Sequence, residues 1–207
     1  MPPRPEVPPN RNTTKQRRRL RVAVFLTGVL GTALLASSLL TIPAQASVLT
    51  TSLNVTAIKQ AQSNWCWATA IEMIQKYKKN MDFGQCSIVN SGLGTADCPN
   101  SAADVATVRA ALANIGLSSA DASGMLAWAS LTRQIDSNQP WIYFYMYSTG
   151  TVGHMVTITG YWSETTCPGC NTVYYNDPAT GAKTSGSPGA LASNDSFHAY
   201  WSIFSIS

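Results

Sequence analysis

The sequence contains few histidines, and the part that we expect to fold has no excess of positive charge. His154 and His198 are the only two histidines among 207 residues. Of the 14 Lys and Arg residues, seven precede position 47, as does one of the ten acidic residues. The rest of the chain therefore carries seven basic against nine acidic side chains, a net charge of −2. This balance excludes the basic surface that is typical of nucleic-acid binding, so we expect no nucleic-acid partner.

Residues 1–46 have the organisation of a secretory signal peptide. A Pro- and Arg-rich start is followed by an apolar run over 22–42 and then by Ala44-Gln45-Ala46. A basic segment, an apolar segment and a small-residue site in this order predict cleavage before Ser47 and export from the cell. The alternative is an uncleaved anchor, since about 20 apolar residues can span a bilayer. After cleavage we expect one secreted domain, residues 47–207, without a stable membrane association.

The five cysteines all lie after the predicted cleavage site. An exported protein reaches an oxidising compartment, where paired cysteines form disulfides. Because five is an odd number, one thiol is left over, and such a thiol in a secreted chain is a candidate reactive group. With Cys66 set aside, the other four allow three pairings. We favour Cys86–Cys98 and Cys167–Cys170, because both pairs are local and close loops.

Two other uses of these four cysteines compete with disulfides. They could bind zinc, and Cys167 and Cys170, with two residues between them, could form a redox pair. Export favours disulfides over zinc. Redox motifs of the thioredoxin type occur beside a βαβ unit, whereas this one lies between two predicted strands. We therefore expect no metal and no cofactor.

The apolar pattern changes from helical to extended along the domain. Apolar residues at three- and four-residue steps predict helices over 65–80, 101–116 and 123–137. Dense aromatic and β-branched residues predict strands over 141–147, 154–162, 172–177 and 198–206. Residues 81–100, rich in Gly, Ser, Asn and Asp, are expected to form a loop. Helices followed by strands predict an α+β domain in which the helices pack on a mostly antiparallel sheet.

Cys66 stands where the first helical pattern begins, with Gln60 six residues upstream and a tryptophan on either side. A helix N-terminus supplies partial positive charge and unpaired N–H groups. Both favour the thiolate, which is the nucleophilic form of cysteine. We therefore interpret Cys66 as a catalytic nucleophile. The alternative is a structural role, because free cysteine is among the most frequently buried residue types.

A catalytic cysteine needs a histidine as base and a third group that orients the histidine. His154 stands at the start of one predicted strand, and Asp177 ends the next. If these two strands pair through a hairpin, base and orienting acid lie near the same edge. His198 begins the last strand, and only Asp195 is placed to orient it. We therefore favour His154 as the base.

Three motifs occur in order along the chain: Gln60-x5-Cys66-Trp67-Ala68, then Gly153-His154-x-Val156, then Asn176-Asp177-Pro178 with Gly181. In this combination the chain resembles the papain-like cysteine peptidases over most of residues 55–207. It looks most like their compact bacterial branch, such as the AvrRpt2-type effectors and the C39-like domains. The resemblance implies a papain-like fold, in which the helix with the nucleophile packs against a sheet with the histidine and the acid.

By position in these motifs, the resemblance implies a role for each of four residues. Cys66 matches the nucleophile, His154 the base and Asp177 the third member of the triad. Gln60 matches the amide that donates a hydrogen bond to the oxyanion, a role worth about 2.7–4 kcal/mol for one preorganised donor. Asn176 stays open as an alternative to Asp177, because some papain-like enzymes use Asn as the third member.

The candidate triad and the resemblance together predict a secreted thiol endopeptidase. We expect it to act as a monomer on a protein or peptide substrate. One alternative is a cysteine-dependent amidase or acyl transferase on the same fold. Another is a secreted binding protein without catalysis, against which the complete set of nucleophile, base and acid argues.

Overall fold

The computed structural model describes residues 45–167 and 169–207. The predicted signal peptide lies outside these residues, except for its last two positions. Within the described part of the chain, none of the helices has both the length and the apolar character that a membrane span requires. The first regular element of the described residues, β1 (Val48–Ser52), begins next to the predicted cleavage site.

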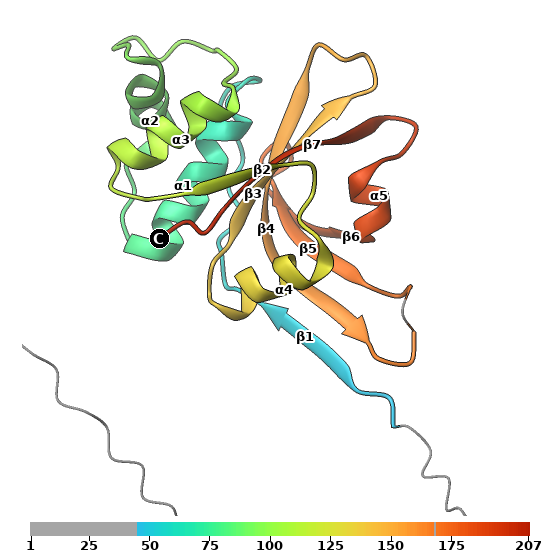
Figure 1. Cartoon of the computed structure of the whole chain (residues 1–207). Coiled ribbons are helices and arrows are strands. Elements are labelled where there is room, and N and C mark those ends of the chain that lie inside the picture. The colour runs from blue at the N-terminus through green and yellow to red at the C-terminus, as the bar shows by residue number, and fades with distance from the viewer. Residues whose placement is uncertain (1–44, 168) are drawn as a thin grey trace, which may run out of the picture. The chain divides into compact units, whose positions relative to one another are not determined.

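A seven-stranded sheet forms one half of the molecule (Figure 1). The strands lie in the order β2-β7-β3-β4-β5-β6, β1 pairs with β4, and every pairing is antiparallel. The remaining strands are β2 (Ala120–Ser123), β3 (Trp141–Tyr147), β4 (Gly153–Glu164), β5 (Thr172–Asp177), β6 (Ala182–Gly186) and β7 (Phe197–Phe204). The antiparallel sheet confirms the predicted α+β class, and all four predicted strands are present within two residues of their expected ends.

In the described part of the chain, helices α1 (Cys66–Lys79), α2 (Gly84–Leu93) and α3 (Val105–Asn114) pack beside the sheet as a second group, and two shorter helices, α4 (Trp128–Asp136) and α5 (Pro188–Ala192), lie near the sheet itself (Figure 1). Asn80 caps α1 in the left-handed conformation, as the predicted helix end requires. Lys78 and Lys79 precede it, where cations interact favourably with the negative end of the helix dipole.

The alternation of side chains along β3 divides the hydrophobic core in two. Ile142 faces the helices and packs in one cluster with Trp67 and Ile71 of α1. Trp141 and Tyr143 face the other way, into a second cluster with Leu131 and Ile135 of α4. Burying a large apolar side chain of this kind contributes about 1.5–3 kcal/mol. The two clusters therefore fix both faces of the strand that neighbours the candidate base.

The prediction of a loop over residues 81–100 was wrong, because helix α2 occupies most of it. The Gly, Ser and Asn residues that suggested a loop are compatible with this helix because tertiary contacts override weak propensity. Ile88 and Val89 are fully buried in the cluster around α1. A Cβ atom at Gly92 would lie 2.9 Å from Cη2 of Trp67, so this glycine lets the two helices approach closely.

Three other boundaries differ from the sequence prediction. Helix α3 begins after Asp104, whose side chain caps it, and not at Ser101. The predicted helix over 123–137 begins only at Trp128, because Ser123 ends strand β2 at the edge of the sheet and a non-helical connection over 124–127 follows it. Strand β6 was not expected, since its residues are polar and mostly exposed. Its pairing with β5 extends the sheet beside Asp177.

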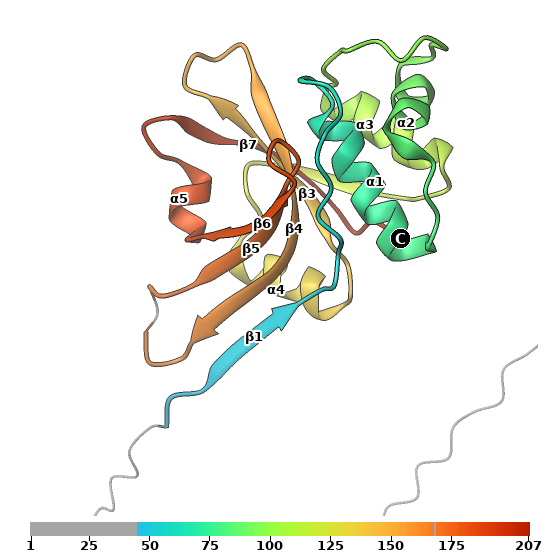
Figure 2. The ribbon, with the colours of Figure 1, turned by 180° about the vertical axis from the view of Figure 1, so that it is seen from behind.

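Residues 53–65 form an extended segment that leads from the sheet to the start of α1 (Figure 2). The N–H of Leu53 donates to the carbonyl of Thr159 at 2.8 Å. Further along, the N–H of Gln60 donates to the carbonyl of Pro178, also at 2.8 Å. Two backbone hydrogen bonds thus hold this segment against the sheet on the N-terminal side of Cys66.

Candidate active site

Cys66 is the first residue of α1 and the one free cysteine of the described residues. Cys86 lies beside Cys98 and Cys167 beside Cys170 at disulfide distance, with Cα atoms 5.1 and 5.3 Å apart. These are the two pairs that the sequence analysis favoured. Helix α1 has no side-chain cap and no acidic residue in its first turn. Its unpaired N–H groups and positive dipole end are therefore available to a negative charge at Cys66.

His154 and Asp177 meet on neighbouring strands of the sheet. His154 stands at the start of β4 and Asp177 at the end of β5, so the β4–β5 hairpin brings them together. The His154 Nε2 and Asp177 Oδ1 atoms are 2.6 Å apart. Both side chains are largely withdrawn from solvent, with exposed fractions of 9% and 22%. Low local polarity strengthens such a charge-assisted hydrogen bond.

The surroundings of His154 favour its charged form. Burial lowers the pKa of His154, but hydrogen bonds with Asp177 and with Cys66 and the negative charges of both outweigh it. The net effect raises the pKa of His154 from its ordinary 6.5 to about 9. The same hydrogen bond lowers the pKa of Asp177, assisted by the backbone N–H of Ala179 and the hydroxyl of Thr180. At neutral pH the pair is therefore an imidazolium beside a carboxylate.

The two residues that the sequence left as alternatives point elsewhere. Asn176 is fully buried, and its Nδ2 donates to the carbonyl of Val55 at 3.1 Å. Its side chain therefore braces the segment that leads to α1 and does not reach His154. His198 on β7 is exposed and pairs across the sheet with Met146. It does not line the cavity that Cys66 and His154 share.

Gln60 also lines this cavity, but its amide is already engaged. The Nε2 group donates to the carbonyls of Gln62 at 2.8 Å and of Ser63 at 2.7 Å. These two bonds use both amide hydrogens. The Oε1 atom is buried without a hydrogen-bond partner. In this structure Gln60 thus holds the turn that precedes Cys66, and neither of its donors is free.

The loop over residues 99–101, which no sequence motif indicated, holds the segment around Cys66. Residues 99–101, directly after Cys98, accept hydrogen bonds from the indole N–H groups of Trp65 at 2.9 Å and Trp67 at 3.1 Å. Asn64 donates two more to Asn100, from its backbone N–H to Oδ1 and from its Nδ2 to the backbone carbonyl, each of 2.9 Å. Since these contacts span more than 30 residues, no local sequence pattern indicated them.

Tyr145 is a second residue that the sequence did not indicate. It lies opposite His154 in the β3–β4 register, and the two rings meet edge to face with centroids 5.6 Å apart. Phe197 stacks on Tyr145 with a centroid distance of 4.2 Å. This aromatic pair fixes the orientation of the His154 ring and keeps water from one side of it. Burial also raises the pKa of Tyr145, so its hydroxyl stays neutral.

The shared cavity has a volume of about 660 Å³. Its walls come from the nucleophile segment and the 102–104 loop on one side and from strands β3, β4 and β7 on the other. A cavity of this size can enclose several residues of an extended peptide. Within the described residues, no group of three or more His, Cys, Asp or Glu side chains is arranged to hold a metal ion.

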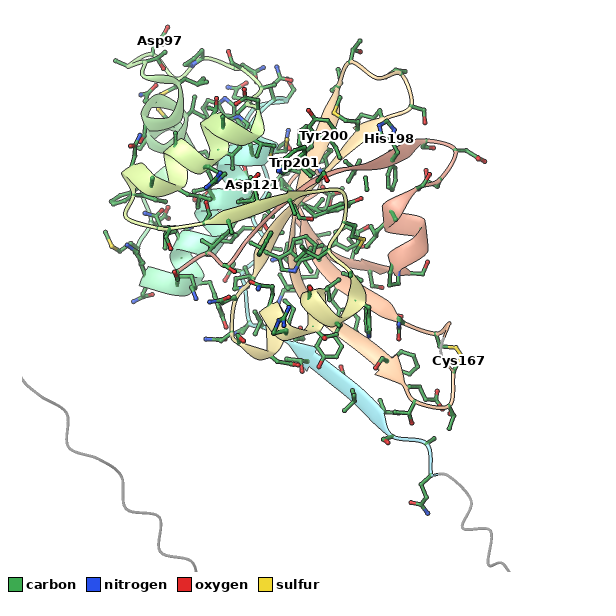
Figure 3. The ribbon with its side chains drawn as sticks, viewed as in Figure 1. Asp97, Asp121, Cys167, His198, Tyr200 and Trp201 are labelled. Carbon is green, nitrogen blue, oxygen red and sulfur yellow. A yellow bond between two sulfur atoms is a disulfide. The ribbon has the colours of Figure 1, made fainter. Side chains whose placement is uncertain are left out.

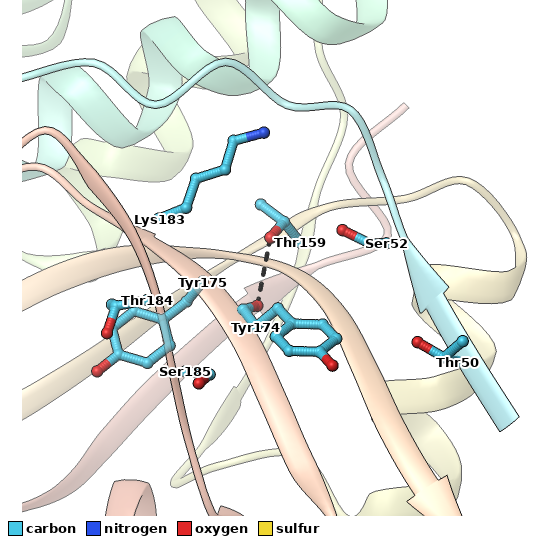
Figure 4. Close-up of a pocket in the computed structure, with 8 residues that line it drawn as sticks. All are labelled: Thr50, Ser52, Thr159, Tyr174, Tyr175, Lys183, Thr184 and Ser185. Carbon is cyan, nitrogen blue, oxygen red and sulfur yellow. Dashed lines mark hydrogen bonds between the residues drawn. The ribbon is translucent and has the colours of Figure 1, made fainter. Parts of the chain in front are cut away.

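A second cavity, of about 440 Å³, lies on the sheet near β1, β5 and β6 (Figure 4). Hydroxyl groups line most of it, and Lys183 is its only charged residue. The hydroxyl of Thr159 donates to the carbonyl of Tyr174 across its floor at 3.3 Å. It contains no cysteine or histidine, so the chemistry described above belongs to the larger cavity alone.

Comparisons with known proteins agree with this architecture. The family model described as papain-like cysteine protease AvrRpt2 matches residues 48–196. The peptidase domain of Streptococcus ComA, a bi-functional ABC transporter involved in a quorum sensing pathway, has a TM-score of 0.55 and 13% sequence identity. That match covers 74% of this chain and 98% of that domain. At this identity it shows a common fold alone.

A double glycine motif protease from an AMS/PCAT transporter, solved with the leader peptide, has a TM-score of 0.48 and 18% identity. It covers 74% of this chain and 93% of that one. No curated protein matches the chain significantly. The family match and the ComA domain confirm the predicted resemblance and the papain-like fold.

Proposed function

The chain belongs to the family of AvrRpt2 papain-like cysteine proteases, and we propose that it is a secreted endopeptidase whose nucleophile is Cys66. The observation that carries this proposal is that Cys66 and His154 line one cavity while Asp177 binds the histidine. The free thiol lies at an uncapped helix N-terminus, and the Nε2 atom of His154 is 2.6 Å from Oδ1 of Asp177. Nucleophile, base and orienting acid in mutual contact are the requirements of thiol catalysis.

In the first half of the reaction, the Cys66 thiolate attacks a peptide carbonyl. The bond from sulfur to carbon forms, and the carbonyl oxygen takes the negative charge. His154 then gives its proton to the leaving nitrogen as the carbon–nitrogen bond breaks, which releases the amine product and leaves a thioester. Because Asp177 engages Nε2, the other ring nitrogen of His154 is the one that serves the thiol and the substrate.

In the second half, water hydrolyses the thioester. His154, now neutral, takes a proton from the water, whose oxygen attacks the carbonyl carbon. The carbon–sulfur bond breaks, the acid product leaves, and the thiolate–imidazolium pair is restored. Asp177 keeps the imidazole oriented throughout and stabilises its positive charge whenever His154 is protonated.

The oxyanion of both intermediates needs hydrogen-bond donors. We assign the backbone N–H of Cys66 as the first donor, since it belongs to the uncapped first turn of α1. Gln60 supplies the second, as its place in the motif implies. Because both of its amide hydrogens are engaged, it must release the carbonyl of Ser63 or Gln62 when substrate binds.

We further propose that residues 1–46 are a signal peptide and that the secreted domain is 47–207. Strand β1 begins at Val48, so cleavage before Ser47 leaves this strand complete. The substrate is then an extracellular protein or peptide. N-terminal sequencing of protein from culture medium tests the cleavage site. An N-terminus elsewhere would reject the proposed boundary without affecting the catalytic assignment.

A thiol-directed epoxide inhibitor tests the nucleophile. Wild-type protein should lose its hydrolysis of casein, and peptide mapping should find one adduct, on Cys66. Cys66→Ala should abolish hydrolysis and labelling together, whereas Asp97→Asn, an exposed change in the α2–α3 connection, should leave both intact. Casein hydrolysis by a folded Cys66→Ala protein would overturn the proposal. Cleavage of cell-wall fragments but not of casein would favour an amidase on the same fold.

A further inference from the structure

The cavity around Cys66 has an unbalanced charge distribution. We propose that Asp104 selects substrates that carry a Lys or Arg side chain near the scissile bond. The inference rests on the proposed peptidase function and extends it to substrate choice. Asp104 is exposed on the wall of the cavity that contains Cys66 and His154. It also lines a smaller depression of about 190 Å³, which Tyr200 and Trp201 share with it.

One oxygen of the Asp104 carboxylate already accepts a hydrogen bond. Its Oδ1 atom accepts the backbone N–H of Thr107 at 2.8 Å, as the cap of helix α3. This hydrogen bond is the main cause that lowers the pKa of Asp104, so the carboxylate is ionised throughout the working range of a peptidase. The side chain of Thr107 lowers this pKa further, and no Lys or Arg of the described residues forms an ion pair with Asp104.

Asp121 provides a comparison, because its negative charge is neutralised by a neighbouring cation. Asp121 of β2 forms an ion pair with Arg109 and accepts the indole N–H of Trp201 at 2.9 Å. Figure 3 shows Asp121 beside Trp201 and Tyr200. Asp104 has no such cation, and no Lys or Arg of the described chain lines its cavity. Of the described groups that line the cavity, His154 alone is cationic, and Asp177 already pairs with it, so a cationic side chain of the substrate is the complement that Asp104 can take.

The wall that faces Asp104 is apolar and partly exposed. The rings of Phe144 and Tyr200 meet edge to face at 4.9 Å, and Tyr200 keeps an exposed fraction of 43%. Val152, 57% exposed, continues this wall on the β3–β4 connection. Lys and Arg side chains combine an apolar stem with a charged tip. Such a side chain can pack its stem on the rings, bring its cation to Asp104 and gain from the face of Tyr200.

Helix capping alone does not require a charge at this position. Asn is as good a cap as Asp, because its side-chain oxygen accepts the same N–H. The variant Asp104→Asn therefore preserves the cap and removes only the negative charge. The variant Asp104→Glu keeps the charge near the cavity. Asp97→Asn removes an exposed acid that Figure 3 shows well away from Tyr200, and it serves as the matched control.

The test compares paired fluorogenic peptides that differ at one position, with Lys or the uncharged norleucine of similar shape. Each position on both sides of the scissile bond is varied in turn. At one position, the wild-type protein and Asp97→Asn should show about fivefold higher kcat/KM for Lys, the range of a partly exposed ion pair. In Asp104→Asn this ratio should fall to about one, and in Asp104→Glu it should stay above one. Added salt should lower the wild-type ratio.

Three results would overturn the inference. The first is a wild-type protein that cleaves both peptides of every pair equally, which leaves the peptidase assignment intact. The second is a lysine preference that Asp104→Asn retains in full, because its origin then lies elsewhere in the cavity. The third is the absence of any Cys66-dependent cleavage, which removes the proposed function together with the inference. Thermal unfolding of each variant excludes loss of fold as the cause.

Discussion

The segment that carries Cys66 and the hairpin that carries His154 and Asp177 are held in place by different means. The hairpin is held by backbone ladders with strands on both sides, so its geometry depends little on any one side chain. The segment before Cys66 has no regular secondary structure. Its position depends on the amide of Gln60 and on side-chain hydrogen bonds to residues 99–101.

This difference indicates where the site is vulnerable. The Cys86–Cys98 disulfide lies directly before the 99–101 loop and therefore holds the nucleophile side of the cavity. The Cys167–Cys170 disulfide closes the far end of the β4–β5 hairpin, and Figure 3 shows Cys167 at the tip of the sheet, distant from Tyr200. Removal of the Cys86–Cys98 disulfide should therefore lower the catalytic rate, whereas removal of the Cys167–Cys170 disulfide should not.

The largest expected effect is the difference in kcat between variants of the two histidines of the sheet. His154→Ala removes the proposed acid–base group and should lower kcat by about 10²–10⁴-fold, the usual contribution of such a group. His198→Ala changes an exposed side chain outside the cavity and should stay within twofold of wild type. Steady-state hydrolysis of one peptide measures both. A comparable loss in His198→Ala would mean that the wrong histidine has been assigned.

The next effect compares the two disulfides. Cys86→Ser/Cys98→Ser should lower kcat/KM by about tenfold to a hundredfold, because small misplacements of reacting groups cost up to about 10²-fold. It should also lower the free energy of unfolding by about 3 kcal/mol, as expected for a loop of this length. Cys167→Ser/Cys170→Ser should leave kcat/KM unchanged. The variants are preferable to reducing agents, because Cys66 must stay reduced in both states.

Equal activity of the two disulfide variants would contradict this difference. So would normal activity of Cys86→Ser/Cys98→Ser at a temperature where it is fully folded. Denaturant unfolding followed by fluorescence supplies the stabilities, and the same samples supply the kinetics. The substitution Asn100→Ala is a milder version of the same change, since it removes the side-chain acceptor of the Asn64 N–H and the donor to the Ser63 hydroxyl, and leaves the disulfide intact.

The smallest expected effect is a change in the pH dependence of activity. With the pKa of His154 raised to about 9, the proton for the leaving amine is present at neutral pH and is lost as the pH rises through about 9. The activity should therefore fall on the alkaline side near pH 9. Asp177→Asn removes the main stabilising partner of the charge and should move this fall to lower pH. An alkaline limb that does not move would show that Asp177 does not hold the charge of His154.

The raised pKa of His154 also predicts how the stability of the fold depends on pH. Because the folded pKa of His154 lies above its ordinary 6.5, the stabilising contribution of its charged form is complete below pH 6.5. It is lost as the pH rises toward and through about 9. Melting temperatures of the wild-type protein and Asp177→Asn should therefore differ most below pH 6.5 and converge above pH 9.

The sequence by itself determined the features that depend on neighbouring residues. It placed Cys66 at the start of a helix from the apolar spacing that begins there, and it ended that helix at Asn80. It located β4 and β5 from their β-branched and aromatic residues, so that His154 and Asp177 could be assigned to one hairpin. The favoured pairs of cysteines followed from their short separations. Helix period, strand period and short loop closure are local properties, and local patterns record them.

Only the tertiary structure decided what depends on groups far apart in the chain. Helix α2 exists because α1 buries its apolar side, although its own composition suggested a loop. Asp177 and not Asn176 contacts His154, because β-strand alternation turns Asn176 toward the carbonyl of Val55. The engaged amide of Gln60 and the lack of a cationic partner for Asp104 among the described residues were equally invisible in the sequence. A side chain's partners are set by packing between distant segments, and the order of residues along the chain does not encode them in any local pattern.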